Sequence, residues 1–175
     1  EAAAVALSRV LLDRGDRPAA RQALIKHIDR SQAFQIAVLP VEAILTLAEV
    51  EIELSLHDEA ERRLRRLRHE GGVTRARTRL LLGWIAASRQ EPWAEQILAE
   101  AIEGLEPRAA HASDPHIGLR FRGQVMLAER RLLLGQLQSS KELLQTARVL
   151  ADRLSDEAFH ARLDLLEGDQ CRHAD

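Results

Sequence analysis

The chain has 175 residues, of which 46% are hydrophobic and 30% charged, and these proportions exclude a disordered chain. A formal net charge of −2 provides no overall field that would draw the protein to nucleic acid or to an anionic membrane. The single cysteine, Cys171, excludes an internal disulfide, and no apolar run reaches the roughly 20 residues of a membrane span.

The apolar residues recur with the period of an α-helix, and Gly, Pro and capping residues divide the chain into helical segments. Gly15 ends the first segment, Thr74 is expected to cap the fifth, and Ser139 with Glu142 forms a capping box for the eighth. The helices are expected over residues 1–14, 17–30, 40–55, 58–70, 74–88, 92–104, 116–134, 139–154 and 155–168. Residues 105–114 are expected to form a loop that Asp114-Pro115 closes, and residues 169–175 a frayed polar tail.

One stretch is ambiguous between helix and strand. From Val50 to Leu56, apolar and polar residues alternate, which by itself is a strand pattern. No other stretch alternates convincingly, and a lone strand would have no partner with which to pair. We therefore expect a helix here.

A turn followed by an amphipathic helix occurs four times along the chain. A small residue occupies positions 20, 60, 94 and 140, and a leucine follows four residues later in each case. The intervals of 40, 34 and 46 residues are typical of stacked two-helix units, which bury their apolar faces only against neighbouring units. The sequence therefore predicts an all-α domain over residues 1–168, built as a superhelix of about four helix-turn-helix repeats with a terminal helix.

The spacing resembles the tetratricopeptide repeat. The family pattern falls on four matching sets of residues. These are Ala4, Leu7, Ser8, Leu11, Ala20, Leu24 and His27; Ile44, Leu47, Ala48, Glu51, Ala60, Leu64 and Leu67; Thr78, Leu81, Leu82, Ile85, Ala94, Leu98 and Ala101; and Gln124, Leu127, Ala128, Arg131, Ser140, Leu144 and Ala147. The resemblance implies a right-handed α-α superhelix, although leucine, isoleucine, Glu51 and Arg131 stand where the family carries aromatic residues.

Intervals above 34 residues resemble the longer repeats in the regulatory arms of bacterial signal-transduction ATPases and of MalT/LuxR-type transcription activators. The resemblance implies a binding groove lined by the first helix of each pair. The groove positions are Val5, Arg9, Leu12, Leu45, Glu49, Ile52, Arg79, Gly83, Ala86, Arg122, Val125, Glu129 and Leu132. The Lys and Asn residues with which chaperone-binding members hold a C-terminal carboxylate are missing at these positions, so we do not expect that clamp.

A run of arginines within residues 62–79 is the strongest charge feature. Five of them form a candidate basic patch: Arg62, Arg63, Arg65, Arg66 and Arg68. Two interpretations remain open, a phosphate-binding or acidic-partner patch and a solvated face neutralised by Glu59, Glu61 and the glutamates of residues 42–53. No aromatic side chains are interleaved for stacking on bases, so we expect the solvated face.

No arrangement of residues indicates catalysis. His111, Asp114 and His116 lie close together but lack the ligand number and spacing of a metal site, and no glycine-rich phosphate loop is present. We therefore expect no enzyme, metal or cofactor, but a cytoplasmic scaffold that binds a protein, a peptide, neighbouring domains of its own chain or a small effector. Because the first residue is Glu1 rather than Met, we expect this chain to be part of a longer protein.

The favoured setting is the sensory or regulatory arm of a bacterial transcription regulator or signal-transduction ATPase. A peptide-binding adaptor or secretion chaperone is the first alternative, and a nucleic-acid-binding repeat protein that uses the basic patch is the second. We expect neither nucleic acid nor a membrane to be the partner of this domain.

Overall fold

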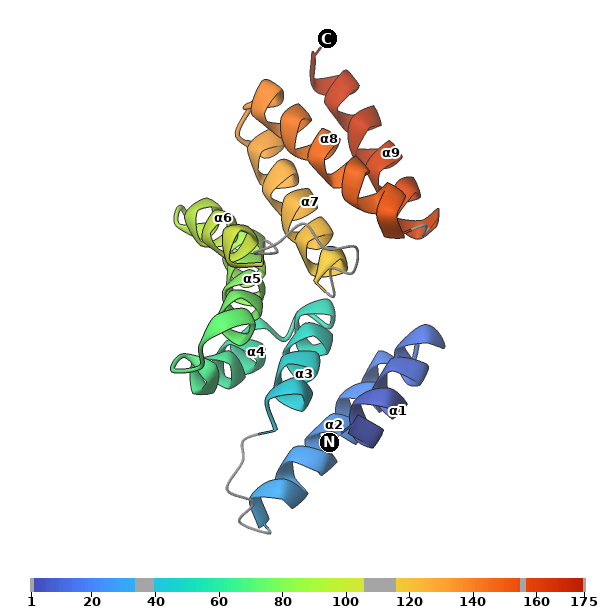
Figure 1. The fold of residues 1–175 in the computed structure, drawn as a ribbon, viewed down its shortest axis with the longest axis vertical. Coiled ribbons are helices and arrows are strands. Elements are labelled where there is room, and N and C mark those ends of the chain that lie inside the picture. Colours follow the sequence, from blue (N-terminus) through green and yellow to red (C-terminus); the bar gives the residue numbers. More distant parts are fainter. Residues whose placement is uncertain (1, 34–39, 106–115, 155–156, 175) are drawn as a thin grey trace. The chain divides into compact units, whose positions relative to one another are not determined.

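The structure is a computed structural model that describes residues 2–33, 40–105, 116–154 and 157–174 (Figure 1). These residues form nine α-helices and one short 3₁₀ helix, and they contain no strand. The elements are α1 (Ala2–Asp13), α2 (Arg17–Ala33), α3 (Val41–Glu53), α4 (His57–Leu64), η1 (Arg65–Leu67), α5 (Gly72–Ser88), α6 (Ala94–Gly104), α7 (Ile117–Leu133), α8 (Leu137–Leu154) and α9 (Glu157–Ala174). The prediction of an all-α fold is confirmed, and so is the helix through residues 50–53.

Several predicted ends of helices are wrong. The expected helix over 58–70 is α4 followed by η1, so its last turn is tightened. Thr74 and Ser139 do not cap, because α5 begins at Gly72 and α8 at Leu137, which places both residues inside the first turn of their helices. The Ser139 hydroxyl instead accepts a hydrogen bond from Arg131 of α7.

The end of the chain also differs from the prediction. Helix α9 continues through Gly168 to Ala174, where a frayed tail was expected. A glycine inside a helix costs only about 1 kcal/mol relative to alanine, so a single glycine need not end one. The predicted loop after Leu105 and the Asp114-Pro115 cap lie outside the described residues.

The chain divides into two compact units, Glu1–Ile85 and Ala86–Asp175. Each unit has its own cluster of buried apolar side chains. The first cluster takes residues from α1 to α5, and the second takes them from α7, α8 and α9. This division is expected where helix pairs contact only their neighbours, because no single core then unites the chain.

The repeated small residue and leucine are buried in every repeat. Ala20, Ala60, Ala94 and Ser140 are fully buried, as are the leucines four residues later. A small side chain here allows the second helix of a pair to approach the first closely. In the last pair, the hydroxyl of Ser140 donates a hydrogen bond of 2.9 Å to the carbonyl oxygen of Ala128 on α7, so this polar group is satisfied in the core.

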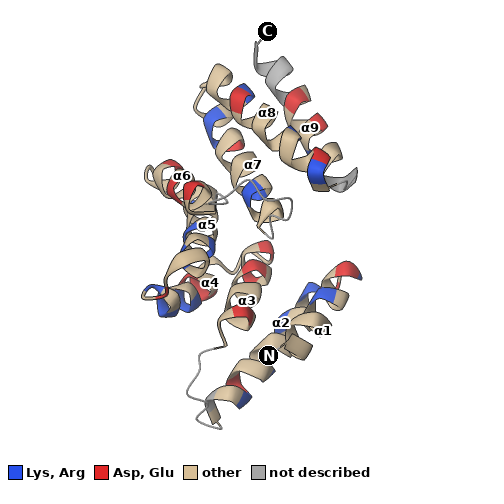
Figure 2. Cartoon of the chain, in the orientation of Figure 1, with Lys and Arg blue, Asp and Glu red and all other residues tan. Residues whose placement is uncertain are grey.

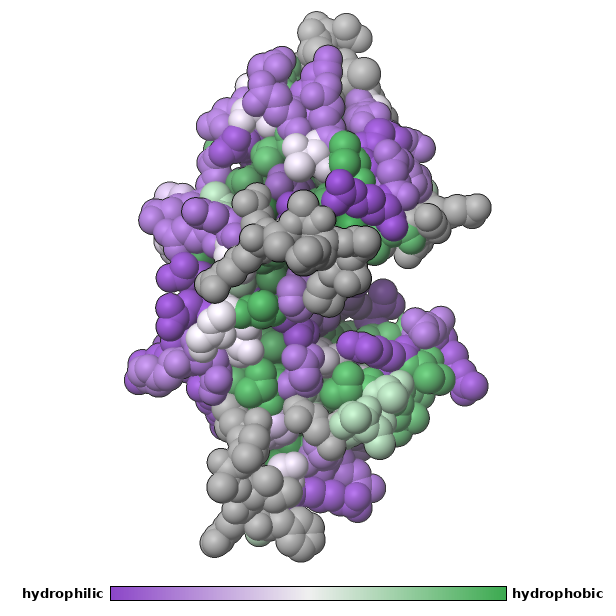
Figure 3. Space-filling view, in the orientation of Figure 1, coloured by the Kyte–Doolittle hydropathy of each residue, from purple (hydrophilic) through white to green (hydrophobic). Residues whose placement is uncertain are grey.

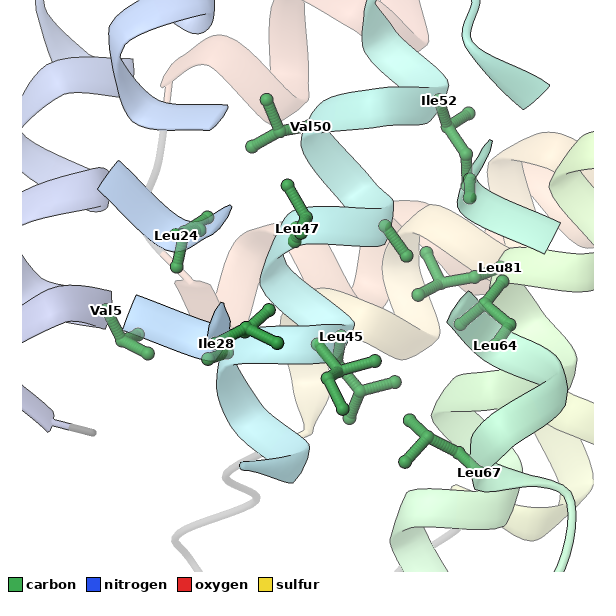
Figure 4. Close-up of a cluster of buried hydrophobic side chains, with 14 of the residues drawn as sticks. Val5, Leu24, Ile28, Leu45, Leu47, Val50, Ile52, Leu64, Leu67 and Leu81 are labelled. Atoms are coloured by element: carbon green, nitrogen blue, oxygen red, sulfur yellow. The ribbon is translucent and has the colours of Figure 1, made fainter. Parts of the chain in front are cut away.

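The second helix of one pair also packs against the first helix of the next. Helix α2 contacts α3, α6 contacts α7, and α8 contacts α9. In the first unit, Leu24 of α2 lies toward Leu47 and Val50 of α3, whereas Leu64 and Leu81 lie on the other side of α3 (Figure 4). Helix α3 is therefore covered on both sides, which explains why nine of its 13 residues are buried.

The same backbone turn ends the first helix of each of the four pairs. At Gly15, Ser55, Gln90 and Gly135 the backbone is left-handed, with φ between 58° and 77°. In each turn, this residue and the next donate backbone hydrogen bonds to carbonyls three and five residues earlier, the pattern of a Schellman motif. This turn is therefore more regular in the structure than in the sequence. Ser55 and Gln90 adopt the left-handed conformation that favours glycine, although neither of them is a glycine.

We expect the residue at this turn to control stability through its backbone. Ser55→Gly should raise the free energy of unfolding by about 0.5–1 kcal/mol because it relieves the left-handed strain, and Gly15→Ala should lower it by about 1 kcal/mol. A β-carbon at Gly15 meets no atom within 4 Å, so the effect there would be purely conformational. Urea unfolding measures both changes.

Gly71→Ala is the matched control, because Gly71 has ordinary backbone angles and equally open surroundings. An unchanged unfolding midpoint for both Ser55→Gly and Gly15→Ala would contradict the assignment of strain to this turn.

Candidate functional site

The first helices of the pairs in the unit Glu1–Ile85 form one face of that unit. Helix α1 contacts α3, and side chains of α5 reach α3. On this face lies a hollow of about 310 Å³, lined by Ala2, Val5, Ala6 and Arg9 of α1 and by Glu42 at the start of α3. The lining residues of α1 fall one helical turn apart, so they share a side of that helix. The hollow is open, mainly apolar, and carries one charged group of each sign.

Arg77 of α5 pairs with the acidic residues of α3 on this face. Its guanidinium donates hydrogen bonds of 2.7 and 2.8 Å to the two carboxylate oxygens of Glu42, and it lies 3.8 Å from a carboxylate oxygen of Glu49. The side chain of Arg77 is only 15% exposed, so these carboxylates offset a charge that is largely removed from water. Figure 2 shows the acidic residues spaced along α3 and the basic residues on α5.

Arg9 differs from Arg77, because it is exposed and makes no hydrogen bond or ion pair with the described residues. Glu42 lies at the same hollow but already holds Arg77. The hollow therefore presents, beside apolar side chains, a cation that has no partner among the described residues. Such a group suits a carboxylate, for which a guanidinium is a strong hydrogen-bond donor.

The structure divides the predicted groove residues of the first unit into exposed and buried sets. Arg9 and Glu49 lie on the surface just described, but Leu45 and Ile52 are buried in the core, and Leu12 packs against it. Residues so buried can support a ligand-binding surface but cannot touch a ligand. Arg79 is half-buried on α5.

In the unit Ala86–Asp175, the predicted groove residues lie on α7, except Ala86, which is buried near the end of α5. Arg122 is exposed and Leu132 is half-buried. Glu129 accepts a hydrogen bond of 2.8 Å from Arg162 of α9, so a predicted ligand-binding carboxylate already has a partner within this unit.

Glu42 and Arg77 are not among the groove residues predicted from the sequence. A signal for them is present in the sequence, because two opposite charges lie 35 residues apart, about one repeat length. Residues one repeat apart on the first helices of adjacent pairs are neighbours in a stack, so such a spacing predicts a cross-repeat ion pair.

The candidate basic patch is not a set of five equivalent cations. Arg62 lies 3.7 Å from Glu59, Arg65 lies 2.7 Å from Glu61, and Arg68 donates a hydrogen bond to His69. Arg66 is exposed, whereas Arg63 turns inward toward α3. Three of the five arginines, Arg62, Arg63 and Arg65, therefore pair with glutamates, one of which, Glu51, lies on α3.

Arg63 contributes to the most deeply buried ionic group in the described part of the first unit. The carboxylate of Glu51 is fully buried on α3 and accepts hydrogen bonds of 3.2 Å from Arg21 on α2 and 2.8 Å from Arg63 on α4. One carboxylate thus joins three helices that belong to two successive pairs. Near the surface, Arg17 of α2 adds a further pair with Glu53 at 2.7 Å.

The matching position in the second unit carries the opposite charge. Arg131 of α7 stands where α3 has Glu51, and it donates a 2.7 Å hydrogen bond to Glu95 of α6 and another hydrogen bond to Ser139 of α8. The residue of α6 that meets it, Glu95, stands where α2 has Arg21. The joint between successive pairs is therefore ionic in both units, with its polarity reversed.

A surface ion-pair group joins α8 to α9. Arg148 donates hydrogen bonds of 2.8 Å to Asp164 and 2.9 Å to Glu167. These two bonds, the one to Asp164 first, raise the pKa of the Arg148 guanidinium above its already high usual value, so it remains charged at any working pH.

Within the described ranges, no group of three or more His, Cys, Asp or Glu residues is placed to hold a metal ion. None of the described helices is both long enough and apolar enough to cross a bilayer. Scans against protein-family models, curated proteins and solved structures each find no match to this chain.

We expect Glu51 to contribute far more to stability than Glu53, its exposed neighbour on α3. Glu51→Gln should lower the free energy of unfolding by about 2–3 kcal/mol, because it leaves two guanidiniums without their carboxylate. This value is below the usual cost of breaking a buried pair, since the side chains of Arg21 and Arg63 are 30% and 23% exposed and can regain water.

Glu53→Gln is the control, since it breaks only the exposed pair with Arg17 and should cost less than about 1 kcal/mol. Urea denaturation compares the two variants. Equal losses of stability would show that the buried carboxylate does not hold the helices together.

Proposed function

We propose that this chain is a non-catalytic helical-repeat scaffold that binds a protein or peptide on the face formed by α1 and α3. The observation that carries the proposal is the open hollow of about 310 Å³ with Arg9 at its edge. This size lies at the small end of the range for ligand pockets, and the hollow is open rather than enclosed. It therefore suits one or two side chains of a longer ligand better than a whole small molecule.

The chemistry of the hollow defines the ligand that fits. Ala2, Val5 and Ala6 provide an apolar floor, and Arg9 provides a cation without a partner among the described residues. A peptide that has a small apolar side chain next to Asp or Glu fits this surface. Its apolar side chain would be buried against the floor, and its carboxylate would pair with Arg9. Glu42 and Arg77 neutralise each other at the same surface. A ligand therefore needs only one negative charge, to balance Arg9.

The wider role that we propose is that of a sensory or regulatory arm in a bacterial transcription regulator or signal-transduction ATPase. The long repeat intervals support this setting, because they resemble those arms. In such an arm, ligand binding would favour one arrangement of neighbouring domains over another. Nucleic-acid binding has weaker support, since most arginines of the candidate basic patch already contact glutamate or histidine.

Selection of peptides from a random display library on the immobilised 175-residue chain tests the proposal. We expect the selected peptides to share an acidic residue next to an apolar one and to bind saturably. Arg9→Glu should weaken their binding at least about tenfold, which corresponds to about 1.4 kcal/mol, a typical loss for one charge-assisted hydrogen bond.

Arg153→Glu is the matched control, because Arg153 is an equally exposed arginine on α8 in the other unit. Both variants should keep the melting temperature of the unmodified chain. The proposal fails if no peptide is enriched, or if Arg9→Glu and Arg153→Glu bind the selected peptides equally well.

A further inference from the structure

Helix α1 exposes an apolar stripe on the side that faces away from the core. Ala3, Leu7 and Val10 lie on one side of the helix, and Leu7 and Val10 are 53% and 48% exposed. We call these three residues the outer face of α1. Figure 3 shows hydrophobic atoms gathered over this helix. The outer face is distinct from the hollow at Val5 and Arg9, which lies on another side of α1.

The same three residue types recur at the same positions in the next repeat. Ala43, Leu47 and Val50 of α3 lie 40 residues after Ala3, Leu7 and Val10, and 40 residues is the interval between the first two repeats. In α3 all three are buried, with exposures of 0%, 0% and 1%. The leucines at the matching positions of α5 and α7, Leu81 and Leu127, are also buried, at 2% and 3%.

In α3, this stripe is the surface on which α2 packs. Leu24 and Ile28 of α2 are buried in the same cluster as Leu47 and Val50, and Leu24 lies toward both of them (Figure 4). With Ala20 they form a line of apolar residues at four-residue steps along α2. The chain therefore contains its own example of the helix that covers an Ala-Leu-Val stripe of this kind.

The charges near the stripe match as well. Beside the stripe of α3, Glu53 pairs with Arg17 at the start of α2 at 2.7 Å. The residue 40 positions before Glu53 is Asp13, which is also acidic. Asp13 is exposed and pairs with none of the described residues. A helix that packed on α1 as α2 packs on α3 would bring a basic residue to Asp13.

We infer that the outer face of α1 is a docking surface for a helix of a partner protein that resembles α2. Such a helix carries a small residue, a leucine and an isoleucine at four-residue steps, with an arginine or lysine in its first turn. The partner helix buries Ala3, Leu7 and Val10, and its basic residue pairs with Asp13. This interaction is separate from peptide binding in the hollow and does not depend on it.

A second copy of the chain does not meet this description in its folded state. The residues that would form the matching face, Leu24 and Ile28, are buried within the first unit. The corresponding leucines of the other second helices, Leu64, Leu98 and Leu144, are buried too. A folded copy therefore has no α2-like face free among its described residues.

A peptide with the sequence of residues 17–31, labelled with a fluorophore, serves as the probe. We expect fluorescence anisotropy to show saturable binding to the intact 175-residue chain. Leu7→Asp should weaken this binding at least about tenfold, because it places a charge in the centre of the apolar contact. Leu133→Asp, at another exposed leucine, is the matched control and should bind as the unmodified chain does.

A charge exchange tests the register of docking. Asp13→Arg should weaken binding of the probe, and a probe with Arg17→Glu should bind this variant better than it binds the unmodified chain. Leu7 and Asp13 are exposed, so we expect these variants to keep the melting temperature of the unmodified chain. Circular dichroism checks that they do.

Three results would overturn the inference. The first is absence of saturable probe binding to the unmodified chain. The second is equal binding to Leu7→Asp and Leu133→Asp. The third is a dimer in analytical ultracentrifugation that Leu7→Asp dissociates, because the outer face of α1 would then be occupied by a second copy.

Discussion

The contact between the second helix of one pair and the first helix of the next is the constraint on which the rest of the structure depends. Leu24 and Ile28 of α2 are buried in one cluster with Leu47 and Val50 of α3. A helix pair has apolar side chains on more sides than its own two helices can cover, so every pair needs a neighbour. The exposed stripe of α1 shows the consequence where no described helix supplies that neighbour.

Polar contacts at the same joint add geometry to this packing. Glu51 is buried and joins α2, α3 and α4, whereas Arg131 with the opposite charge joins α6, α7 and α8. Apolar packing alone tolerates shifts of one helix along another, but a buried charge must meet its partners or pay a large desolvation cost. The reversed polarity also disfavours exchange of one joint's helices for those of the other, because like charges would then meet.

Much of the fold was predictable, because it rests on local patterns. The period of the apolar residues predicted the helices, and the four small residues with their leucines predicted which side of each second helix is buried. Helix ends were less predictable. Thr74 and Ser139 are good capping residues that the structure places inside helices, and Gly168 is a helix breaker that does not break α9. Packing of neighbouring helices outweighs the small energies of such local signals.

For the candidate site, residue types and spacing predicted Arg9 and Glu49 as groove residues, and the structure leaves Arg9 exposed and Glu49 half-buried. They also predicted that glutamates pair with the arginine run, and Arg62, Arg63 and Arg65 do have glutamate partners. They could not separate Arg9 and Glu49 from Leu45 and Ile52, since all four share the pattern of a groove position and only the packed core shows which are buried. Nor could they indicate that Ser55 and Gln90 adopt the backbone of Gly15. Local sequence determines which segments become helices because hydrogen bonds within a helix are local. The tertiary structure decides which charges are paired and which faces stay open, because these depend on side chains that lie about one repeat apart.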